Sequence, residues 1–293
     1  MKSLFGKIFL SKKSSFDKSL FTQKVEGLGG EYLLNPSADA IQGAHGNIII
    51  AKRVSTNTLV AIKHVKAENE NDIALLAQEF SISSSVFHPN IMPFLGGSKR
   101  ARNEWFYLMP FFENGDVETL IQNSMFGLRE QTCWLVIIQI AAALAYLHEN
   151  GIVHADVKPA NILIDNNGNF ILGDFGLSFR IAEKNHDVKK IMGSAGFCAP
   201  EVFNGECGPS SDIFSLAATA VEMKTKRSFI GPGEKNHRNF QRHKTTLNIL
   251  SWYGEKSPFR DQLETMIDSA GKRPTAAQVY EESTKTYRKK YSK

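Results

Sequence analysis

HADVKPAN at residues 154–161, followed by DFG at residues 174–176, is the stretch that decides the fold. The first segment combines a carboxylate, a lysine and an amide, and the second segment adds another carboxylate. Transfer of a phosphoryl group needs a carboxylate that orients the attacking hydroxyl, a cation beside the transferred phosphate and oxygen ligands for Mg²⁺. Each segment alone could be an ordinary helix-end loop or an Asp-Gly turn, but the two together predict a phosphoryl-transfer site.

These segments resemble the catalytic loop and the metal-binding motif of the eukaryotic-type (Hanks-type) serine/threonine protein kinase family. The resemblance implies that Asp156 is the catalytic base and that Lys158 neutralises the transferred charge. It assigns Asn161 and Asp174 to Mg²⁺, with Mn²⁺ as an alternative, and it implies ATP as the phosphoryl donor. Further matches extend the resemblance over roughly residues 38–280.

A lysine and a glutamate upstream complete the catalytic set that the resemblance implies. Lys63 ends VAIK at residues 60–63, where the family has a strand lysine that reaches the α- and β-phosphates. Glu79 lies on a predicted helix, where the family has the ion-pair partner of that lysine. A surface Lys–Glu pair is the alternative, and it would add little to stability. The positions of both residues favour a catalytic switch.

The loop that covers the phosphates is the weakest match. The residues expected to contact the nucleotide there are Ile41, Gly43, Ala44, His45, Gly46 and Ile48. Gly43 and Gly46 supply the last two glycines of G-x-G-x-x-G, whereas Ile41 stands where the first belongs. Two glycines at this spacing are common in ordinary turns, and only their position before Lys63 favours a phosphate loop. We expect Ile41 to stiffen the loop and to weaken nucleotide affinity, because a β-branched residue lacks the dihedral range of glycine.

The segment LMPFFENGD at residues 108–116 resembles the hinge that borders the adenine. The resemblance assigns the remaining nucleotide contacts to Ala61, Met109, Pro110, Phe112, Asp116 and Leu163. The backbone of Pro110 and Phe112 would meet the base, and Met109 would guard a deeper pocket. Asp116 would bond the ribose, while Ala61 and Leu163 would lie on the two faces of the ring. Phe111 and Phe112 could equally be core residues, because aromatic side chains are usually buried for packing.

Three further segments resemble the platform on which the family binds a peptide. Residues 193–201 (GSAGFCAPE) are similar to the end of the activation segment, residues 212–216 (DIFSL) to the start of the central helix, and residues 272–275 (KRPT) to the closing motif. The resemblance implies an ion pair between Glu201 and Arg273. Sugar and aminoglycoside kinases share the ATP site without this platform, so we expect protein substrates rather than small molecules.

Substrate specificity is indicated by three positions. Lys158 is characteristic of serine/threonine kinases, and Ser194 stands where their threonine bonds the catalytic Asp and Lys, so both favour Ser/Thr over Tyr. Ala160 replaces an acid that many arginine-directed members carry. We therefore expect no strong preference for basic residues before the target.

Regulation is where the chain departs most from the family pattern. Many members have an arginine before the catalytic Asp that binds a phosphate on the activation segment, and here that residue is Ala155. Between residues 174 and 201 the only hydroxyl residues are Ser178 and Ser194. We expect an enzyme that is active without phosphorylation of this segment. The alternatives are a pseudokinase that binds nucleotide and acts as a scaffold, and, less favoured, a small-molecule kinase.

The periodicity of the chain changes once, near residue 113, from short β-rich runs to helix. The expected elements are strands at residues 47–51, 58–65 and 105–109 and helices at about 72–86 and 130–150. They predict an α+β, bilobal protein-kinase fold with a small β-rich N-lobe and a larger α-helical C-lobe. The expected boundaries are a basic N-terminal extension (1–25), a kinase domain (26–283) with lobes at about 26–112 and 113–283, and a basic C-terminal tail (284–293).

Charge and cysteine usage limit the partners. Residues 1–24 and 284–293 each carry +5, which leaves −5 on the residues between them because the whole chain carries +5. Basic tails on a mildly acidic body do not predict binding of nucleic acid. The N-terminal lysines flank a short apolar face that could touch an anionic membrane, although one short patch binds membranes poorly.

No membrane-spanning segment is predicted, since charges interrupt every apolar run before about 20 residues, and we expect a soluble protein. Three cysteines without paired spacing indicate a reducing, cytoplasmic compartment, which is the host cytosol if the chain is a delivered effector or a viral kinase. The sequence does not indicate an oligomeric state.

Overall fold

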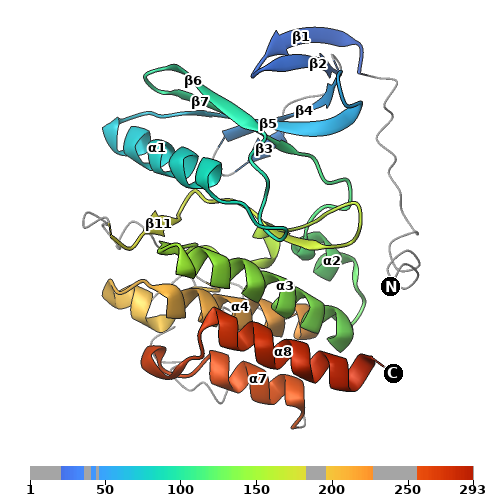
Figure 1. The fold of residues 1–293 in the computed structure, drawn as a ribbon, viewed down its shortest axis with the longest axis vertical. Helices are drawn as coiled ribbons and strands as arrows, with labels where there is room; N and C mark the ends of the chain where they lie inside the picture. Colours follow the sequence, from blue (N-terminus) through green and yellow to red (C-terminus); the bar gives the residue numbers. More distant parts are fainter. Residues whose placement is uncertain (1–20, 36–40, 44–45, 183–195, 227–255, 293) are drawn as a thin grey trace. The chain divides into compact units, whose positions relative to one another are not determined.

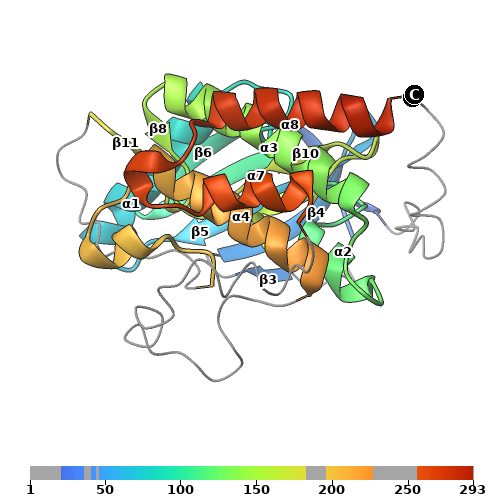
Figure 2. The ribbon, with the colours of Figure 1, turned by 90° about the horizontal axis from the view of Figure 1, so that it is seen from below.

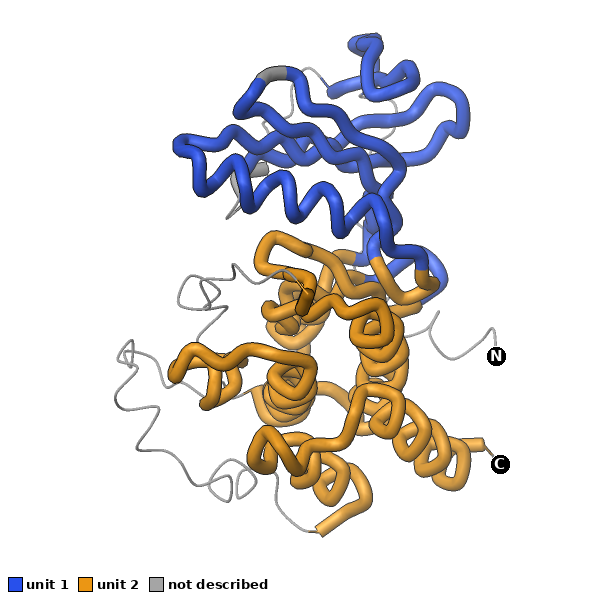
Figure 3. Tube along the Cα trace, turned by 60° about the vertical axis from the view of Figure 1, so that its left-hand side comes forward, with its two compact units in different colours: residues 1–87, 92–114, 164–168 blue, residues 88–91, 115–163, 169–293 orange. Residues whose placement is uncertain are grey.

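The computed structural model describes residues 21–35, 41–43, 46–182, 196–226 and 256–292. The chain divides into two compact units (Figure 3). The first, which we call the sheet unit, contains residues 1–87, 92–114 and 164–168; the second, the helical unit, contains residues 88–91, 115–163 and 169–293. The expected lobe boundary near residue 113 is close to the change from one unit to the other at residues 114 and 115.

The sheet unit is built on an antiparallel sheet with the strand order β1-β2-β4-β5-β7-β6, in which β3 pairs with β4 (Figure 1). Its strands are β1 (Gln23–Gly27), β2 (Gly30–Leu34), β3 (Ile41–Gly43), β4 (Gly46–Arg53), β5 (Thr58–Lys66), β6 (Gly96–Ala101) and β7 (Glu104–Pro110). Helix α1 (Glu70–Ser85) follows β5 and is capped by Asn69, whose side chain accepts a hydrogen bond from the Asp72 N–H. This cap satisfies one of the N–H groups that a helix start leaves unpaired.

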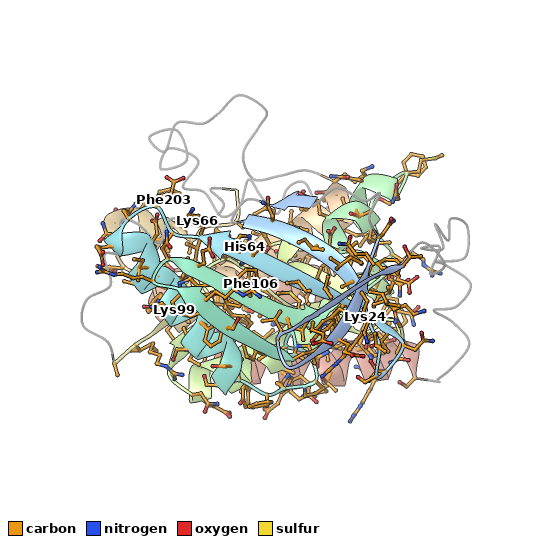
Figure 4. The ribbon with its side chains drawn as sticks, turned by 90° about the horizontal axis from the view of Figure 1, so that it is seen from above. Lys24, His64, Lys66, Lys99, Phe106 and Phe203 are labelled. Carbon is orange, nitrogen blue, oxygen red and sulfur yellow. The ribbon has the colours of Figure 1, made fainter. Side chains whose placement is uncertain are left out.

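Side chains of this sheet alternate between two faces, as the twofold period of a strand requires. On one face, Val65 of β5 packs in a buried cluster with Leu76 of α1. On the other face, Tyr32 of β2 is 1% exposed and is the centre of a second cluster. Beyond that cluster, His64 stacks on Phe106 with ring centroids 4.5 Å apart (Figure 4). The sheet unit therefore has a core on each side of the sheet.

The hairpin of β1 and β2 was not predicted from the sequence. Gly27 pairs with Gly30, so the turn consists of Leu28 and Gly29, whose φ angles are 47° and 75°. A two-residue turn of this type needs positive φ at both positions, and Asn-Gly is the usual signal for it. The domain boundary expected at residue 26 lies inside β1.

The helical unit consists mainly of helices, with short strands around the catalytic loop. The α-helices in its described residues are α2 (Val117–Asn123), α3 (Glu130–Glu149), α4 (Pro209–Thr225), α7 (Pro258–Met266) and α8 (Ala276–Tyr291). Its short strands are β8 (Ile152–Val153), β9 (Ile162–Ile164), β10 (Phe170–Leu172) and β11 (Phe179–Arg180), and its 3₁₀ turns are η2 (Pro159–Asn161), η4 (Pro200–Asn204) and η5 (Ala270–Lys272). Strand β9 pairs with β10, and β11 pairs with β8. The catalytic loop lies between β8 and β9, and the DFG segment lies between β10 and β11. The two strand pairings therefore bring these segments side by side.

Among the described residues, helix α3 is long and apolar enough to cross a membrane by length and composition, although no such segment was predicted. Half of its apolar 18-residue window is buried within the structure. Trp134 and Ile140 are 0% exposed, and α4 and α8 pack against the helix (Figure 2). The apolar run is therefore the core helix of this unit, a role that produces the same composition as a membrane span.

The predicted α+β class is confirmed, and each expected strand and helix is present within a few residues of its expected bounds. Residues 284–291 of the expected basic C-terminal tail are helical and continue α8 as far as Tyr291. There, Gln131 Nε2 donates to the Tyr287 hydroxyl at 3.2 Å, and Lys290 Nζ lies 2.8 Å from Glu130 Oε1. Both contacts join α8 to α3. The N-terminal extension lies mostly outside the described residues.

Candidate active site

The catalytic loop, residues 154–161, is held by a buried aspartate at the start of α4. Asp212 is 0% exposed and accepts hydrogen bonds from the backbone N–H groups of His154 at 2.9 Å and Ala155 at 2.8 Å. His148 Nε2 lies 2.9 Å from Asp212 Oδ2. These bonds stabilise a loop in which Ala155 has a φ of 65°, a conformation that few residues other than glycine adopt. From the sequence, Asp212 was identified only as the first residue of the expected central helix, and its role in holding the loop was missed. The available signal was a carboxylate at the start of an otherwise apolar helix.

Two of the predicted catalytic residues, Asp156 and Lys158, lie in this loop together with Asn161, a predicted metal ligand. Asp156 Oδ2 accepts hydrogen bonds from Lys158 Nζ at 2.7 Å and from Asn161 Nδ2 at 2.9 Å. Asn161 Nδ2 also donates to the Asp156 carbonyl at 2.8 Å. Asp156 and Asn161 are 6% and 7% exposed, so the carboxylate is oriented in a partly desolvated setting in which charge-assisted hydrogen bonds are strong.

The DFG segment is connected to the same loop by three contacts. The Gly173 N–H donates to the Asn161 carbonyl at 2.9 Å, and His154 Nε2 lies 3.1 Å from the Gly173 carbonyl. The Phe175 ring meets the His154 ring edge to face, with centroids 5.2 Å apart. Asp174 has a φ of 60°, which aspartate tolerates better than most residues. The structure therefore places both expected metal ligands on two segments that are bonded to each other.

The ion pair implied for the sheet unit is present. Lys63 Nζ of β5 lies 2.8 Å from Glu79 Oε1 of α1, and the Tyr107 ring lies 5.5 Å from the same Nζ. The two charged side chains are only 12% and 7% exposed. The alternative of a solvated surface pair is therefore wrong. Because breaking a buried pair leaves an uncompensated charge, the pair fixes α1 against β5.

The phosphate-loop segment is described in part. In β3 and β4, Ile41 pairs with Ile48 and Gly43 pairs with Gly46, while Ala44 and His45 lie outside the described residues. Gly46 has a φ of 135°, and a Cβ at this position would lie 2.5 Å from the His64 carbonyl oxygen. Glycine is therefore required at Gly46 by the close approach of β5. The stiffening effect of Ile41 stays a prediction.

The residues expected around the adenine lie in two places. In the sheet unit, Ala61 pairs with Met109, and Pro110 ends β7. Phe112 follows as a half-buried residue. In the helical unit, Asp116 and Leu163 form an antiparallel bridge. Asp116 also has a structural role that the sequence did not indicate, since its Oδ1 accepts the Thr119 N–H at 2.7 Å and caps α2.

The expected platform pair between Glu201 and Arg273 is present. Arg273 Nη2 donates to Glu201 Oε2 at 3.0 Å, and Arg273 Nη1 bonds Glu201 Oε1. Ser211 Oγ donates to the same carboxylate at 3.0 Å. Burial alone would raise the pKa of Glu201, but the hydrogen bonds and charge of Arg273, with those of the backbone and Ser211, hold it below its ordinary value. Ser194 lies outside the described residues.

Comparison with known proteins gives one consistent result. A family model described as "Protein kinase domain" matches residues 41–283. MAP3K epsilon protein kinase 2 of Arabidopsis thaliana is 32% identical over 207 residues, which are 69% of this chain and 15% of that protein. Mitogen-activated protein kinase kinase kinase 4 of Mus musculus is 32% identical over 232 residues, which are 76% of this chain and 14% of that protein. The chain thus spans about a seventh of the length of these relatives.

Proposed function

The chain belongs to the protein kinase family, and we propose that it transfers the γ-phosphoryl group of ATP to serine and threonine hydroxyls of protein substrates. The observation that carries this proposal is the arrangement at Asp156, whose Oδ2 accepts from Lys158 Nζ and Asn161 Nδ2. A carboxylate oriented in this way can accept the proton of an attacking hydroxyl, and the lysine beside it can compensate the charge on the transferred phosphoryl group.

Lys63 is the candidate phosphate ligand, and Asn161 and Asp174 are the candidate metal ligands. Lys63, paired with Glu79, would bond the α- and β-phosphates. An amide oxygen of Asn161 and a carboxylate oxygen of Asp174 form a donor set that suits Mg²⁺, or Mn²⁺ in its place. Two protein ligands are enough for Mg²⁺, because it takes few of them and completes its shell with water and phosphate. When bound, the metal would neutralise phosphate charge.

Serine/threonine specificity is supported by Lys158 and by the relatives, which are named as MAP3K or mitogen-activated protein kinase kinase kinase proteins and, in Dictyostelium discoideum, as a probable serine/threonine-protein kinase. The experiment incubates the wild type and Asp156→Asn with radiolabelled ATP, Mg²⁺ and myelin basic protein or casein, followed by phosphoamino acid analysis. Label on serine and threonine that Asp156→Asn lacks would support the proposal. Label on tyrosine would overturn the specificity. A thermal shift with nucleotide but no transfer would identify the pseudokinase scaffold instead.

We also propose that activity does not need phosphorylation of the activation segment. Ser178 is 1% exposed and its Oγ donates to the His154 carbonyl at 3.0 Å, so its hydroxyl is buried in the site itself. The Ala155 side chain has no group that could bind a phosphate. It packs, together with Cys207, against the buried cluster of Val153 and Phe179. These contacts support an active arrangement that is held by packing and by Asp212 rather than by a phosphate.

The test of this second proposal is the activity of phosphatase-treated protein that mass spectrometry shows to be free of phosphate. We expect it to keep most of its activity on the same generic substrate. A drop of tenfold or more, about 1.4 kcal/mol in the barrier, that rephosphorylation within residues 174–201 restores would contradict the proposal.

A further inference from the structure

Two short segments of the chain run alongside each other in one antiparallel register. Asp116 forms an isolated bridge with Leu163. Two residues earlier, Asn114 Nδ2 donates to the carbonyl oxygen of Asp165 at 2.7 Å, which is two residues after Leu163. The side chain of Asn114 thus adds a second link, across 51 residues of sequence, in the register that the backbone bridge sets.

The acceptor of this bond belongs to a well-ordered turn between β9 and β10. The Asp165 carbonyl also accepts the Gly168 N–H at 3.0 Å, and Asp165 Oδ1 accepts the Asn167 N–H at 2.8 Å. An aspartate that bonds the backbone two residues ahead fixes a turn locally. Asn114 therefore donates to a carbonyl that the hydrogen bonds of the turn already hold in place. Its acceptor does not depend on the Asn114 bond for its position.

The donor belongs to a segment that changes direction. Gly115 has a φ of 69°, a backbone conformation that favours glycine, and Asp116 directly after it caps α2. A segment with a flexible glycine needs an anchor before it if the residue after it is to have one position. The Asn114 amide is placed to be that anchor.

We propose that Asn114 is a positioning residue for the nucleotide, because its amide holds the two segments in the register in which Asp116 and Leu163 face each other. The inference rests on the proposed function, which places the ribose at Asp116 and the adenine at Leu163. Asn114 itself is exposed and needs no contact with the nucleotide. A binding surface that is ordered before the ligand arrives binds it more tightly, because no conformational entropy has to be lost to order that surface at binding.

The expected effect is limited by the strength of one exposed hydrogen bond. Its loss should weaken nucleotide binding by about three- to tenfold. Asn114→Asp is the sharpest variant, because it keeps the shape of the side chain but replaces the donor with a carboxylate, which cannot donate to a carbonyl and is repelled by it. Asn167→Asp is the matched control, since it puts the same charge into the same turn and leaves the Asn114 amide in place.

The experiment measures the Kd of a fluorescent ADP analogue, the KM for ATP, kcat and amide hydrogen exchange of residues 112–118 and 161–168 for both variants and the wild type. We expect Asn114→Asp to raise Kd and KM for ATP by about three- to tenfold, to leave kcat nearly unchanged and to speed exchange in both segments. Asn167→Asp should resemble the wild type.

Equal Kd and equal exchange in Asn114→Asp and the wild type would overturn the inference. A fall in kcat with unchanged Kd would also overturn it, because it would show an effect on chemistry rather than on nucleotide placement. If the wild type binds no nucleotide, the proposed function fails, while the exchange measurement still decides whether Asn114 holds the two segments together.

Discussion

Replacing Glu201 with glutamine tests how the peptide platform is held. The variant removes the negative charge from a pair in which the Arg273 side chain is 1% exposed and the Glu201 side chain 14% exposed. Arg273 keeps its bonds to the carbonyl oxygens of Asp268 at 2.7 Å and Ser210 at 3.0 Å and its position over the Phe214 ring at 5.0 Å. The guanidinium therefore stays in place without its counter-charge.

The expected cost follows from this burial. Removing one partner of a buried pair destabilises a protein by about 3–5 kcal/mol, and the lower end applies here because glutamine keeps one acceptor oxygen. For a unit of this size, a loss of about 3 kcal/mol lowers Tm by roughly 6–12 °C. Glu264→Gln is the control: its i,i+4 partner Arg260 lies 3.0 Å away but Glu264 is 39% exposed, so the expected loss is only about 0.3–0.5 kcal/mol.

The assay is chemical and thermal unfolding of both variants between neutral and acidic pH. The pKa of Glu201 is lowered in the folded protein from an ordinary value of 4.5. The stability that its charge contributes is therefore complete above that ordinary value and is lost as the pH falls through the lowered folded pKa. The difference between wild type and Glu201→Gln should shrink toward acid. A loss below about 1 kcal/mol at neutral pH, or a difference that does not change with pH, would refute the reasoning.

Three further predictions concern the chemistry and the thiols. Asp174→Asn should lower phosphoryl transfer by about a hundredfold or more, because it removes a charged metal ligand. Circular dichroism should show an intact fold, since asparagine also tolerates a φ near 60°. Loss of the fold would contradict the assignment. Asp156→Asn should lower kcat by about 10²–10⁴ and leave the Kd of ADP within about twofold, because the base orients the hydroxyl rather than the nucleotide; equal losses in both would exclude that role. Burial raises the pKa of Cys133, Cys198 and the partly buried Cys207 to about 12. At pH 8, iodoacetamide should therefore label the three thiols much more slowly in the folded protein than in urea, as mass spectrometry can show. Equal rates at Cys133 and Cys198 would contradict their burial.

The candidate catalytic residues could be proposed from the sequence because their identities and spacing are local. HADVKPAN at residues 154–161 needs no partner to be recognised, and Lys63 and Glu79 are found from the strand and helix that carry them. The central helices could be predicted for the same reason, since their apolar residues repeat within a short window.

The sequence alone did not show the β1–β2 hairpin, the extent of α8 or the roles of Asp212 and Asn114. The turn of the hairpin has Leu28 at a position with a φ of 47°, where the local signal would be asparagine or aspartate. Lys285 to Lys290 resemble a solvated tail by composition, and only their contacts with α3 show that they continue a helix.

Local sequence determined which groups this protein can use for chemistry, and tertiary structure decided where those groups are held. Asp212 meets the N–H groups of residues 57 and 58 positions away, and Asn114 meets a carbonyl 51 positions away. A polar side chain has the same local signature whether it faces water or a distant backbone group. Only the packed fold decides whether such a side chain faces water or a distant backbone group, because a buried polar group destabilises the folded state unless it is hydrogen-bonded.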